Sequence, residues 1–211
     1  MSKTQQPLSA LEEYLPANTF TYVEVFLKQY RVILTITRER TSIYGNYQWT
    51  SRTGRHRISV NGNLNKYSFL ITLLHELAHL VTFDKHGPRV MPHGAHWKHE
   101  YGVILSGFLS RRVFPADVEA ELLKTVKNPA ASSCTEESLL RVLRKYDSQK
   151  PGFCLVEEVP ENGVFRLRNG KTFQRMQKAR KRIICRDTHT NRLFYFSPVA
   201  EVELLTNESP L

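Results

Sequence analysis

Residues 73–81 read Leu-Leu-His-Glu-Leu-Ala-His-Leu-Val and lie within an apolar run that extends over residues 69–83. The run contains no Gly or Pro and many good helix formers, so the sequence predicts a helix. On that helix His75 and His79 would lie about 40° apart around the axis and ~6 Å apart along it. Both imidazoles can then reach one metal ion, with the Glu76 carboxylate beside them.

This His-Glu-x-x-His spacing is typical of zinc hydrolases. His75 and His79 would bind Zn²⁺, and Glu76 would accept a proton from a water at the metal. Two imidazoles and a carboxylate are costly to bury on an apolar helix without a partner, which favours a metal ion. The alternative is a helix whose polar residues face solvent between two apolar stripes. A membrane-spanning helix is excluded because the run is short and interrupted by polar residues.

A third metal ligand must come from beyond this helix. If the helix continued, His86 would lie on the same face as His79 but ~10 Å further along the axis, too far to share the metal. The Gly-Pro pair at 87–88 instead predicts a break, after which His93 opens another helix. We therefore predict His93 as the third ligand, with His96 as its main rival.

The composition of the 211-residue chain is that of a globular protein, and its charge predicts an acidic partner. The apolar fraction is 41%, and the net charge is +10 with a pI near 9.6. Such a balance makes nucleic acid the leading partner, the alternative being a merely soluble basic surface. Three widely spaced cysteines (Cys134, Cys154 and Cys185) form no C-x-x-C pair, so we expect a reducing cytoplasm and no disulfide framework or cysteine zinc site. We expect no signal peptide and no membrane partner.

The remaining patterns in residues 1–150 predict an α+β domain. We expect a small, hairpin-rich sheet, followed by a metal helix that is capped by Asn65. In the helix at 19–30, Tyr22, Val25 and Phe26 share one side, which we interpret as facing the core. The predicted helices cover residues 9–15, 19–30, 66–84, 94–108, 115–126 and 135–146, and the predicted strands cover residues 31–38, 43–49 and 56–60.

The turn-forming segment 147–152 is the best domain boundary, and it divides the chain into residues 1–150 and 151–211. Beyond it the apolar pattern changes to a period of two, which predicts a small all-β unit. Asn169-Gly170 is a strong two-residue hairpin signal. The five predicted strands cover residues 154–159, 164–168, 171–175, 181–187 and 192–196.

This second unit carries a concentration of positive charge. Residues 161–195 contain ten basic residues against two acidic ones, a net charge of +8. Basic side chains on one face of a small sheet can bind phosphates, and interspersed aromatics can stack on bases. The alternative is a solvated basic face whose aromatics point into the core. The predicted nucleic-acid-binding residues are Arg166, Arg168, Lys171, Arg175, Lys178, Arg180, Lys181 and Arg182, and the aromatics are Phe165, Phe173, Phe194 and Tyr195.

The motifs together resemble the SprT-like (Spartan-type) metalloprotease family. The matching residues are His75-Glu76-Leu77-Ala78-His79, the segment His93-Gly94-Ala95-His96-Trp97 fourteen residues later, and Asn61-x-x-Leu64 upstream. The resemblance implies a zincin-like fold with a small antiparallel sheet beside the metal helix, and a third zinc ligand, His93, on the next helix. It also suggests substrates that are attached to DNA. Many members carry a C-terminal zinc ribbon of paired cysteines, which this sequence lacks, so we expect a β unit held together by apolar packing instead.

The leading hypothesis is therefore a zinc-dependent metalloprotease of zincin type with a protein substrate, DNA as a partner and DNA–protein crosslink repair as a role. The alternative is a non-catalytic DNA- or RNA-binding protein in which zinc stabilises the fold. A third hypothesis is a zinc hydrolase that acts on a non-peptide bond, because the same activated water serves other acyl or phosphoryl groups.

Overall fold

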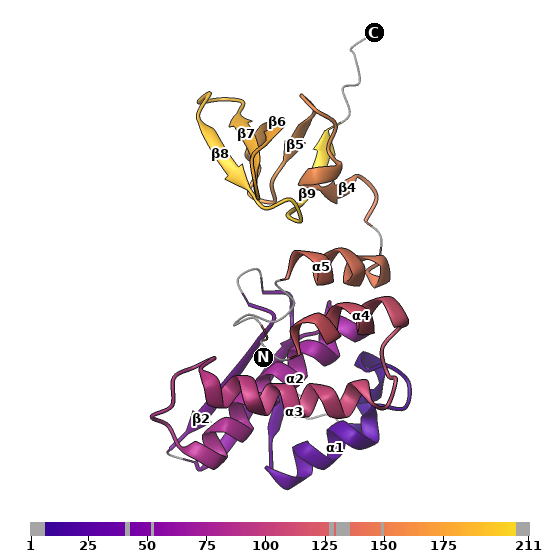
Figure 1. Ribbon diagram of the computed structural model, residues 1–211, viewed down its shortest axis with the longest axis vertical. Helices are drawn as coiled ribbons and strands as arrows, with labels where there is room; N and C mark the ends of the chain where they lie inside the picture. Colours follow the sequence, from indigo (N-terminus) through magenta and orange to yellow (C-terminus); the bar gives the residue numbers. More distant parts are fainter. Residues whose placement is uncertain are drawn as a thin grey trace. The chain divides into compact units, whose positions relative to one another are not determined.

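The computed structural model describes residues 7–40, 43–51, 53–126, 129, 136–148 and 150–205. The chain divides into two compact units, residues 1–147 and 148–211. The first combines helices with a small sheet, and the second contains a separate β-sheet (Figure 1). The fold class is thus mixed α+β. Within the described ranges, no helix has both the length and the apolar character that a membrane crossing requires.

In the first unit every predicted helix is present to within a few residues. The predicted start of the helix at residue 135 lies outside the part of the chain that the structure describes. The elements are the 3-10 helix η1 (Leu8–Tyr14), α1 (Phe20–Gln29), β1 (Ile33–Thr37), β2 (Gly45–Thr50), β3 (Arg55–Asn61), α2 (Lys66–His86), α3 (Ala95–Leu109), α4 (Ala116–Thr125), α5 (Glu137–Leu143) and the 3-10 helix η2 (Arg144–Tyr146).

Helix α2 is the centre of this unit. Asn65 caps its start, as predicted, because its Oδ1 accepts hydrogen bonds from the backbone N–H groups of Tyr67 and Ser68 at 3.1 and 2.9 Å. The helix ends at Gly87, whose φ of 77° is a conformation that favours glycine. Between these caps α2 packs against α3 and against strands β2 and β3 (Figure 1). Most of its side chains are therefore buried.

The sheet beside α2 is mixed, so the prediction of an antiparallel sheet is wrong. The strand order is β1-β3-β2, with β2 and β3 antiparallel but β1 parallel to β3. The reason lies in the connection after β1, which crosses to the far side of β3 before β2 begins. Arg40 holds this crossing by donating to Asn61 Oδ1 at 2.7 Å and Ser59 Oγ at 3.0 Å. As a result β2 forms an edge of the sheet.

Helix α1 faces the core with a different side from the one predicted. Val23 and Leu27 are buried, whereas Tyr22 and Val25 are 39% and 60% exposed. Phe26 is only partly buried at the margin of the core. The sequence pattern therefore identified the helix but not the orientation of its inner face.

The second unit is a six-stranded antiparallel sheet in the order β4-β9-β5-β6-β7-β8. The predicted hairpin at Asn169-Gly170 is present, with Gly170 at φ 84°. Two predictions are wrong: residues 156–158 form a 3-10 turn rather than a strand, and β9 was not expected. The elements are β4 (Phe153–Leu155), η3 (Val156–Glu158), β5 (Val164–Arg166), β6 (Thr172–Lys178), β7 (Ile183–Asp187), β8 (Leu193–Phe196) and β9 (Glu201–Leu205).

Apolar side chains fill the interior of the second unit. Phe165, Phe173, Ile183 and Cys185 form its centre, and each is at most 2% exposed. Cys154 and Cys185 are both free thiols, while Cys134 lies outside the described residues.

Candidate metal centre

Three histidine side chains converge at one point in the first unit. Their Nε2 atoms form a triangle with sides of 3.1 Å (His75 to His93), 3.3 Å (His75 to His79) and 2.9 Å (His79 to His93). Tetrahedral zinc sites with Zn–N bonds of 2.0–2.1 Å require neighbouring ligand nitrogens about 3.3 Å apart. The three side chains can therefore hold a metal ion with little rearrangement.

Local structure explains why these rings meet. His75 and His79 stand one turn apart on the same face of α2. His93 precedes the N-cap of α3, and its φ of 59° reverses the chain so that its ring returns to α2. Gly94 allows this tight return, because a Cβ there would lie 3.0 Å from the Met91 carbonyl oxygen.

Burial keeps the three imidazoles neutral. It lowers the pKa of His75 to about 3 and that of His79 to about 4, and mutual repulsion among the rings adds to the effect. The pKa of His93 is also lowered by burial. Neutral imidazole is the form that binds metal ions, so the cluster is in its ligand state at neutral pH.

Trp97 of α3 forms a wall behind all three histidines. Its ring centroid lies 4.6 Å from that of His75, 5.3 Å from His79 and 4.7 Å from His93. Tyr101, one turn further along α3, stacks on Trp97 at 5.1 Å. Trp97 is fully buried and thereby fixes the histidine rings by packing.

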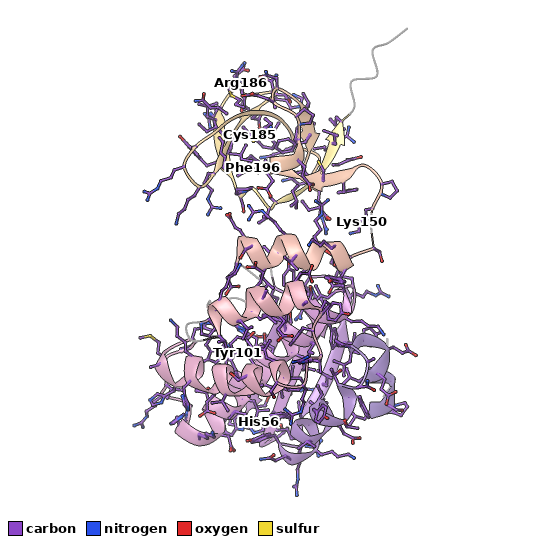
Figure 2. All side chains as sticks on the ribbon, turned by 45° about the vertical axis from the view of Figure 1, so that its right-hand side comes forward. His56, Tyr101, Lys150, Cys185, Arg186 and Phe196 are labelled. Carbon is purple, nitrogen blue, oxygen red and sulfur yellow. The ribbon has the colours of Figure 1, made fainter. Side chains whose placement is uncertain are left out.

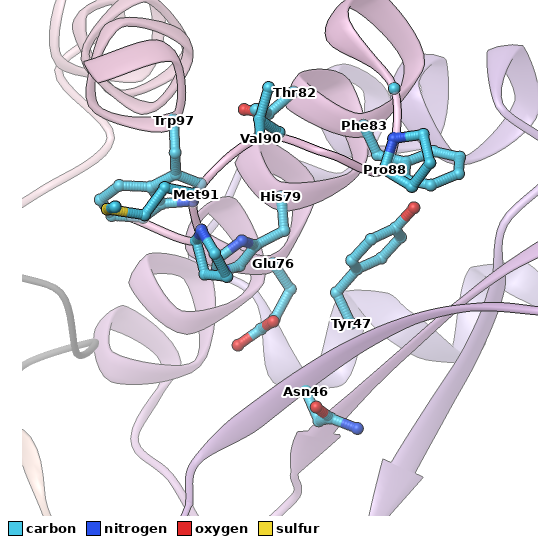
Figure 3. Close-up of a pocket in the computed structure, with 12 residues that line it drawn as sticks. Asn46, Tyr47, Glu76, His79, Thr82, Phe83, Pro88, Val90, Met91 and Trp97 are labelled. Carbon is cyan, nitrogen blue, oxygen red and sulfur yellow. The ribbon is translucent and has the colours of Figure 1, made fainter. Parts of the chain in front are cut away.

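Glu76 points from α2 towards β2 (Figure 3). Burial raises the pKa of Glu76 to about 8, although the backbone N–H of Tyr47 donates to it and Arg40 attracts its charge. The strand approaches so closely that a Cβ at Gly45 would lie 2.6 Å from Glu76 Oε1. Gly45 is therefore needed for this approach.

Tyr47 is a site residue that sequence reasoning missed. Its ring lies parallel to that of His79, with centroids 6.4 Å apart, and its hydroxyl forms a 3.0 Å hydrogen bond with His56 Nδ1. Burial, helped by the negative charge of Asp84, raises the pKa of Tyr47 far above its usual value. No motif or spacing marks Tyr47, because the pairing of β2 alone brings it to the histidines.

A cavity of about 310 Å³ opens beside Glu76 and His79 (Figure 3). Strand β2 forms one side, α2 another, and the loop before α3 a third. An extended ligand can reach both groups from this cavity. Its lining residues are Asn46, Tyr47, Glu76, His79, Thr82, Phe83, Gly87, Pro88, Val90, Met91, Pro92 and Trp97.

His96 lies away from this cluster. Its ring packs on that of His86, with centroids 4.1 Å apart. His86 Nε2 in turn lies 3.8 Å from Glu100 Oε1, and Lys85 donates to the other oxygen of Glu100 at 2.8 Å. Of the two rivals for a third ligand, the structure thus brings His93 and not His96 to the pair on α2.

The predicted nucleic-acid-binding residues of the second unit fall into two groups. Arg166 and Arg168 lie beside Glu203 and Glu201, at 3.4 and 3.2 Å, and half-buried Arg175 donates to the Val159 carbonyl at 2.7 Å. The second group consists of Lys171, Lys178, Arg180, Lys181 and Arg182, which are exposed, as Arg166 and Arg168 also are. Among the aromatics, Phe165 and Phe173 are core residues, whereas Phe194 and Tyr195 are 41% and 66% exposed.

The first unit thus contains a three-histidine cluster that could hold a metal ion, with a carboxylate and a cavity beside it. These features make it a candidate metal-binding unit. Residues 13–106 match the family model of the SprT-like family, so this part of the chain is a SprT-like region, as its motifs predict. The matched region contains all three clustered histidines, Glu76, Gly45 and Trp97. No curated protein and no solved structure matches the chain.

Proposed function

We propose that this protein is a zinc-dependent metallopeptidase of zincin type. The observation that carries the proposal is the triangle of His75, His79 and His93 nitrogens with the buried Glu76 carboxylate nearby, where Glu76 and His79 line one cavity. The match to the SprT-like family supports the same conclusion.

The donor set fits zinc. Three neutral imidazole nitrogens are a common protein ligand set for catalytic Zn²⁺, and they leave a fourth coordination position for water or substrate. When bound there, Zn²⁺ supplies a Lewis acid that polarises a peptide carbonyl and lowers the pKa of a coordinated water to about 7.

Glu76 performs the proton transfers. Its carboxylate accepts a proton as water attacks the peptide carbonyl, and it then gives that proton to the departing amine. Burial raises the pKa of Glu76, and a cation bound nearby would lower that pKa again. The two opposing effects favour a carboxyl group that gains and loses a proton near neutral pH. Gly45 and the Tyr47 N–H position the carboxylate for both steps.

We further propose that the substrates are proteins associated with DNA, in agreement with a role in the repair of DNA–protein crosslinks. The support is the basic second unit, whose exposed Lys and Arg side chains suit a phosphate backbone. We also propose a cytoplasmic location, which the cysteine pattern of the sequence favours.

A zinc-depletion experiment tests the peptidase. The purified chain is stripped with a chelator, reconstituted with increasing Zn²⁺, and assayed on a basic DNA-binding protein with DNA present. We expect cleavage to rise with zinc and to saturate at one ion per chain. If zinc binds and stabilises the fold but no peptide bond is cleaved, the alternative of a zinc-stabilised nucleic-acid-binding protein replaces this proposal. Cleavage of only ester or phosphoryl substrates would instead favour a different zinc hydrolase.

A further inference from the structure

We propose that the cavity beside Glu76 and His79 selects substrates by the side chain that follows the cleaved bond, and that it takes an apolar side chain of the size of leucine, methionine or phenylalanine. The inference rests on the proposed peptidase function and deepens it, because it gives that same site a sequence preference. It makes Phe83 and Val90 the residues that set the size of the accepted side chain.

The position of Glu76 decides which substrate residue reaches the cavity. In the proposed reaction Glu76 gives a proton to the departing amine, so that nitrogen must lie within hydrogen-bond reach of the carboxylate. The amine belongs to the residue that follows the cleaved bond, and the Cα atom bonded to it carries the side chain. Since Glu76 lines the cavity, this side chain is the one that enters it.

Strand β2 and helix α2 form two walls of the cavity (Figure 3). The alternate residues Tyr47 and Trp49 of β2 both face α2. The Tyr47 ring lies parallel to that of His79, with centroids 6.4 Å apart. Trp49 packs on Phe83 at 4.9 Å and does not itself line the cavity. Phe83 is therefore held in place from outside the cavity.

The segment 87–92, which precedes His93, forms the third wall. Its two prolines restrict its backbone, and the Met91 carbonyl accepts the Gly94 N–H at 3.0 Å. Val90 is half-buried, whereas Met91 is 77% exposed. Val90 therefore limits the depth of the cavity, and Met91 lies at its mouth.

The chemistry of the lining favours an apolar occupant. All lining residues are described, and they include no Lys, Arg or Asp and only one carboxylate, that of Glu76. The Thr82 Oγ1 and Trp97 Nε1 atoms are buried and offer no hydrogen bond to an occupant. The Tyr47 hydroxyl is already bonded to Nδ1 of His56 at 3.0 Å (His56 is labelled in Figure 2).

A charged side chain therefore finds no suitable partner in the cavity. An acidic side chain would be repelled by Glu76 and would stay unpaired, which is costly in a buried place. A basic side chain could pair only with the carboxylate that the reaction needs. Both kinds of substrate should be cleaved poorly.

The volume of the cavity sets the size of the occupant. It measures about 310 Å³, near the lower limit of ~300–1,000 Å³ for small-molecule sites, so it holds one side chain and not a longer segment. One missing methylene in an apolar pocket lowers kcat/KM by roughly 10- to 200-fold. Alanine in place of leucine should therefore be cleaved about tenfold more slowly or worse.

Cleavage of a peptide series by the zinc-loaded chain tests the inference. The peptides share a glycine–serine sequence with one variable position, which carries leucine, phenylalanine, alanine, lysine or aspartate, and mass spectrometry locates the cleaved bond. We expect cleavage on the amino side of leucine and phenylalanine, with kcat/KM about tenfold or more above that of the other three. Equal rates across the series, or cleavage on the carboxyl side of the variable residue, would overturn the inference.

Two substitutions should change the preference in opposite directions. Phe83→Ala enlarges the cavity and should raise the ratio of phenylalanine to leucine cleavage about tenfold. Val90→Phe fills part of the cavity and should raise the ratio of alanine to leucine cleavage by a similar factor. An equal loss of rate for every peptide in both variants would overturn the assignment of Phe83 and Val90.

Phe26→Ala is the matched control for these variants. Phe26 is also a partly buried aromatic residue of the first unit, but it does not line the cavity. We expect this variant to keep the wild-type preference even where its thermal melt shows lower stability. A changed preference in Phe26→Ala would show that loss of packing alone alters selectivity, which would overturn the assignment.

A binding measurement separates this inference from the peptidase proposal. Glu76→Gln should bind a labelled leucine peptide about tenfold more tightly than the alanine peptide, as measured by fluorescence anisotropy without turnover. If wild type cleaves the peptides without preference, the pocket assignment is wrong and the peptidase proposal stands. If no peptide is cleaved but the leucine peptide is bound selectively, the peptidase proposal fails and the preference of the cavity stands. Neither cleavage nor selective binding would overturn both.

Discussion

Gly45→Ala tests how closely β2 must approach Glu76. The added Cβ would lie 2.6 Å from Glu76 Oε1, 2.9 Å from Glu76 Cγ and 2.7 Å from Thr72 Cγ2. An ordinary contact begins at 3.4 Å, so the carboxylate oxygen or the strand must move by about 0.8 Å. A misplacement near 1 Å of a catalytic group can cost on the order of 100-fold in rate. We therefore expect a 10- to 100-fold lower kcat.

Zinc binding should survive this substitution, because the three nearest atoms to the new Cβ belong to Thr72 and Glu76 and to no histidine. Overpacking should lower the free energy of unfolding by about 1–3 kcal/mol. The assay is single-turnover cleavage of a basic protein, with zinc content by atomic emission and stability by urea denaturation.

Gly107→Ala is the matched control for this experiment. Position 107 lies in helix α3, and the nearest atom to its new Cβ is Arg111 Nη1 at an ordinary 3.5 Å. We expect unchanged kcat and zinc content, and stability that is equal or higher by up to ~1 kcal/mol. If Gly45→Ala cleaves at the wild-type rate with zinc bound, the close packing of β2 does not position Glu76 and the reasoning is refuted.

Three other outcomes follow from the geometry of the first unit. Asn65→Ala should lower the free energy of unfolding in urea by roughly 1–3 kcal/mol, since the α2 cap and the Asn65 side-chain bonds to the Leu143 carbonyl and the Asp147 carboxylate are lost; Asn65→Ser, which keeps a capping oxygen and adds no charge beside Asp147, should lose less, and equal losses would rule out the cap as the main cause. His93→Ala should bind zinc at least tenfold more weakly in a chelator competition, whereas His96→Ala should bind it as wild type does; the reverse result would make His96 the ligand. The metal-free protein should lose stability as the pH falls from about 6.5 towards 4, because the pKa of His79 is lowered in the folded state and the unfolded chain then binds more protons. Thermal melts in chelator at pH 7 and pH 4.5 check this, and His79→Gln should show a smaller drop than wild type if the reasoning holds.

The metal helix was predictable because its determinants are local. The cap, the helix formers and the His-Glu-x-x-His spacing all lie within residues 65–83. His93 was predictable as well, since the breaks at Gly87 and Gly94 limit where the chain can return.

Long-range pairing explains what sequence reasoning missed. Nothing near β1 indicates that it pairs in parallel with β3, because the crossing depends on Arg40 bonds to residues about 20 positions away. Tyr47 and Gly45 reach the site only through that sheet. The short β9 shows an alternating pattern too brief to separate from a loop, and only its place between β4 and β5 defines it.

The same limit applies to the basic unit. The charge count covered residues 161–195 and therefore left out Glu201 and Glu203. It could not show that these two carboxylates would lie beside Arg168 and Arg166. Strand order places Arg166 and Arg168 of the predicted set beside the carboxylates of β9. A count of charges along the sequence therefore indicates a partner class better than it indicates a binding surface.

Glu76→Gln gives the most direct test of the zinc-peptidase proposal. The substitution keeps the side-chain shape and removes its ability to accept a proton, while His75, His79 and His93 are unchanged. Zinc content and cleavage of a basic DNA-binding protein are measured for both chains, with and without single-stranded DNA. We predict one zinc in each and cleavage by wild type alone. Cleavage at an undiminished rate by Glu76→Gln would contradict the proposed mechanism, and the absence of zinc from both chains would contradict the metal centre itself.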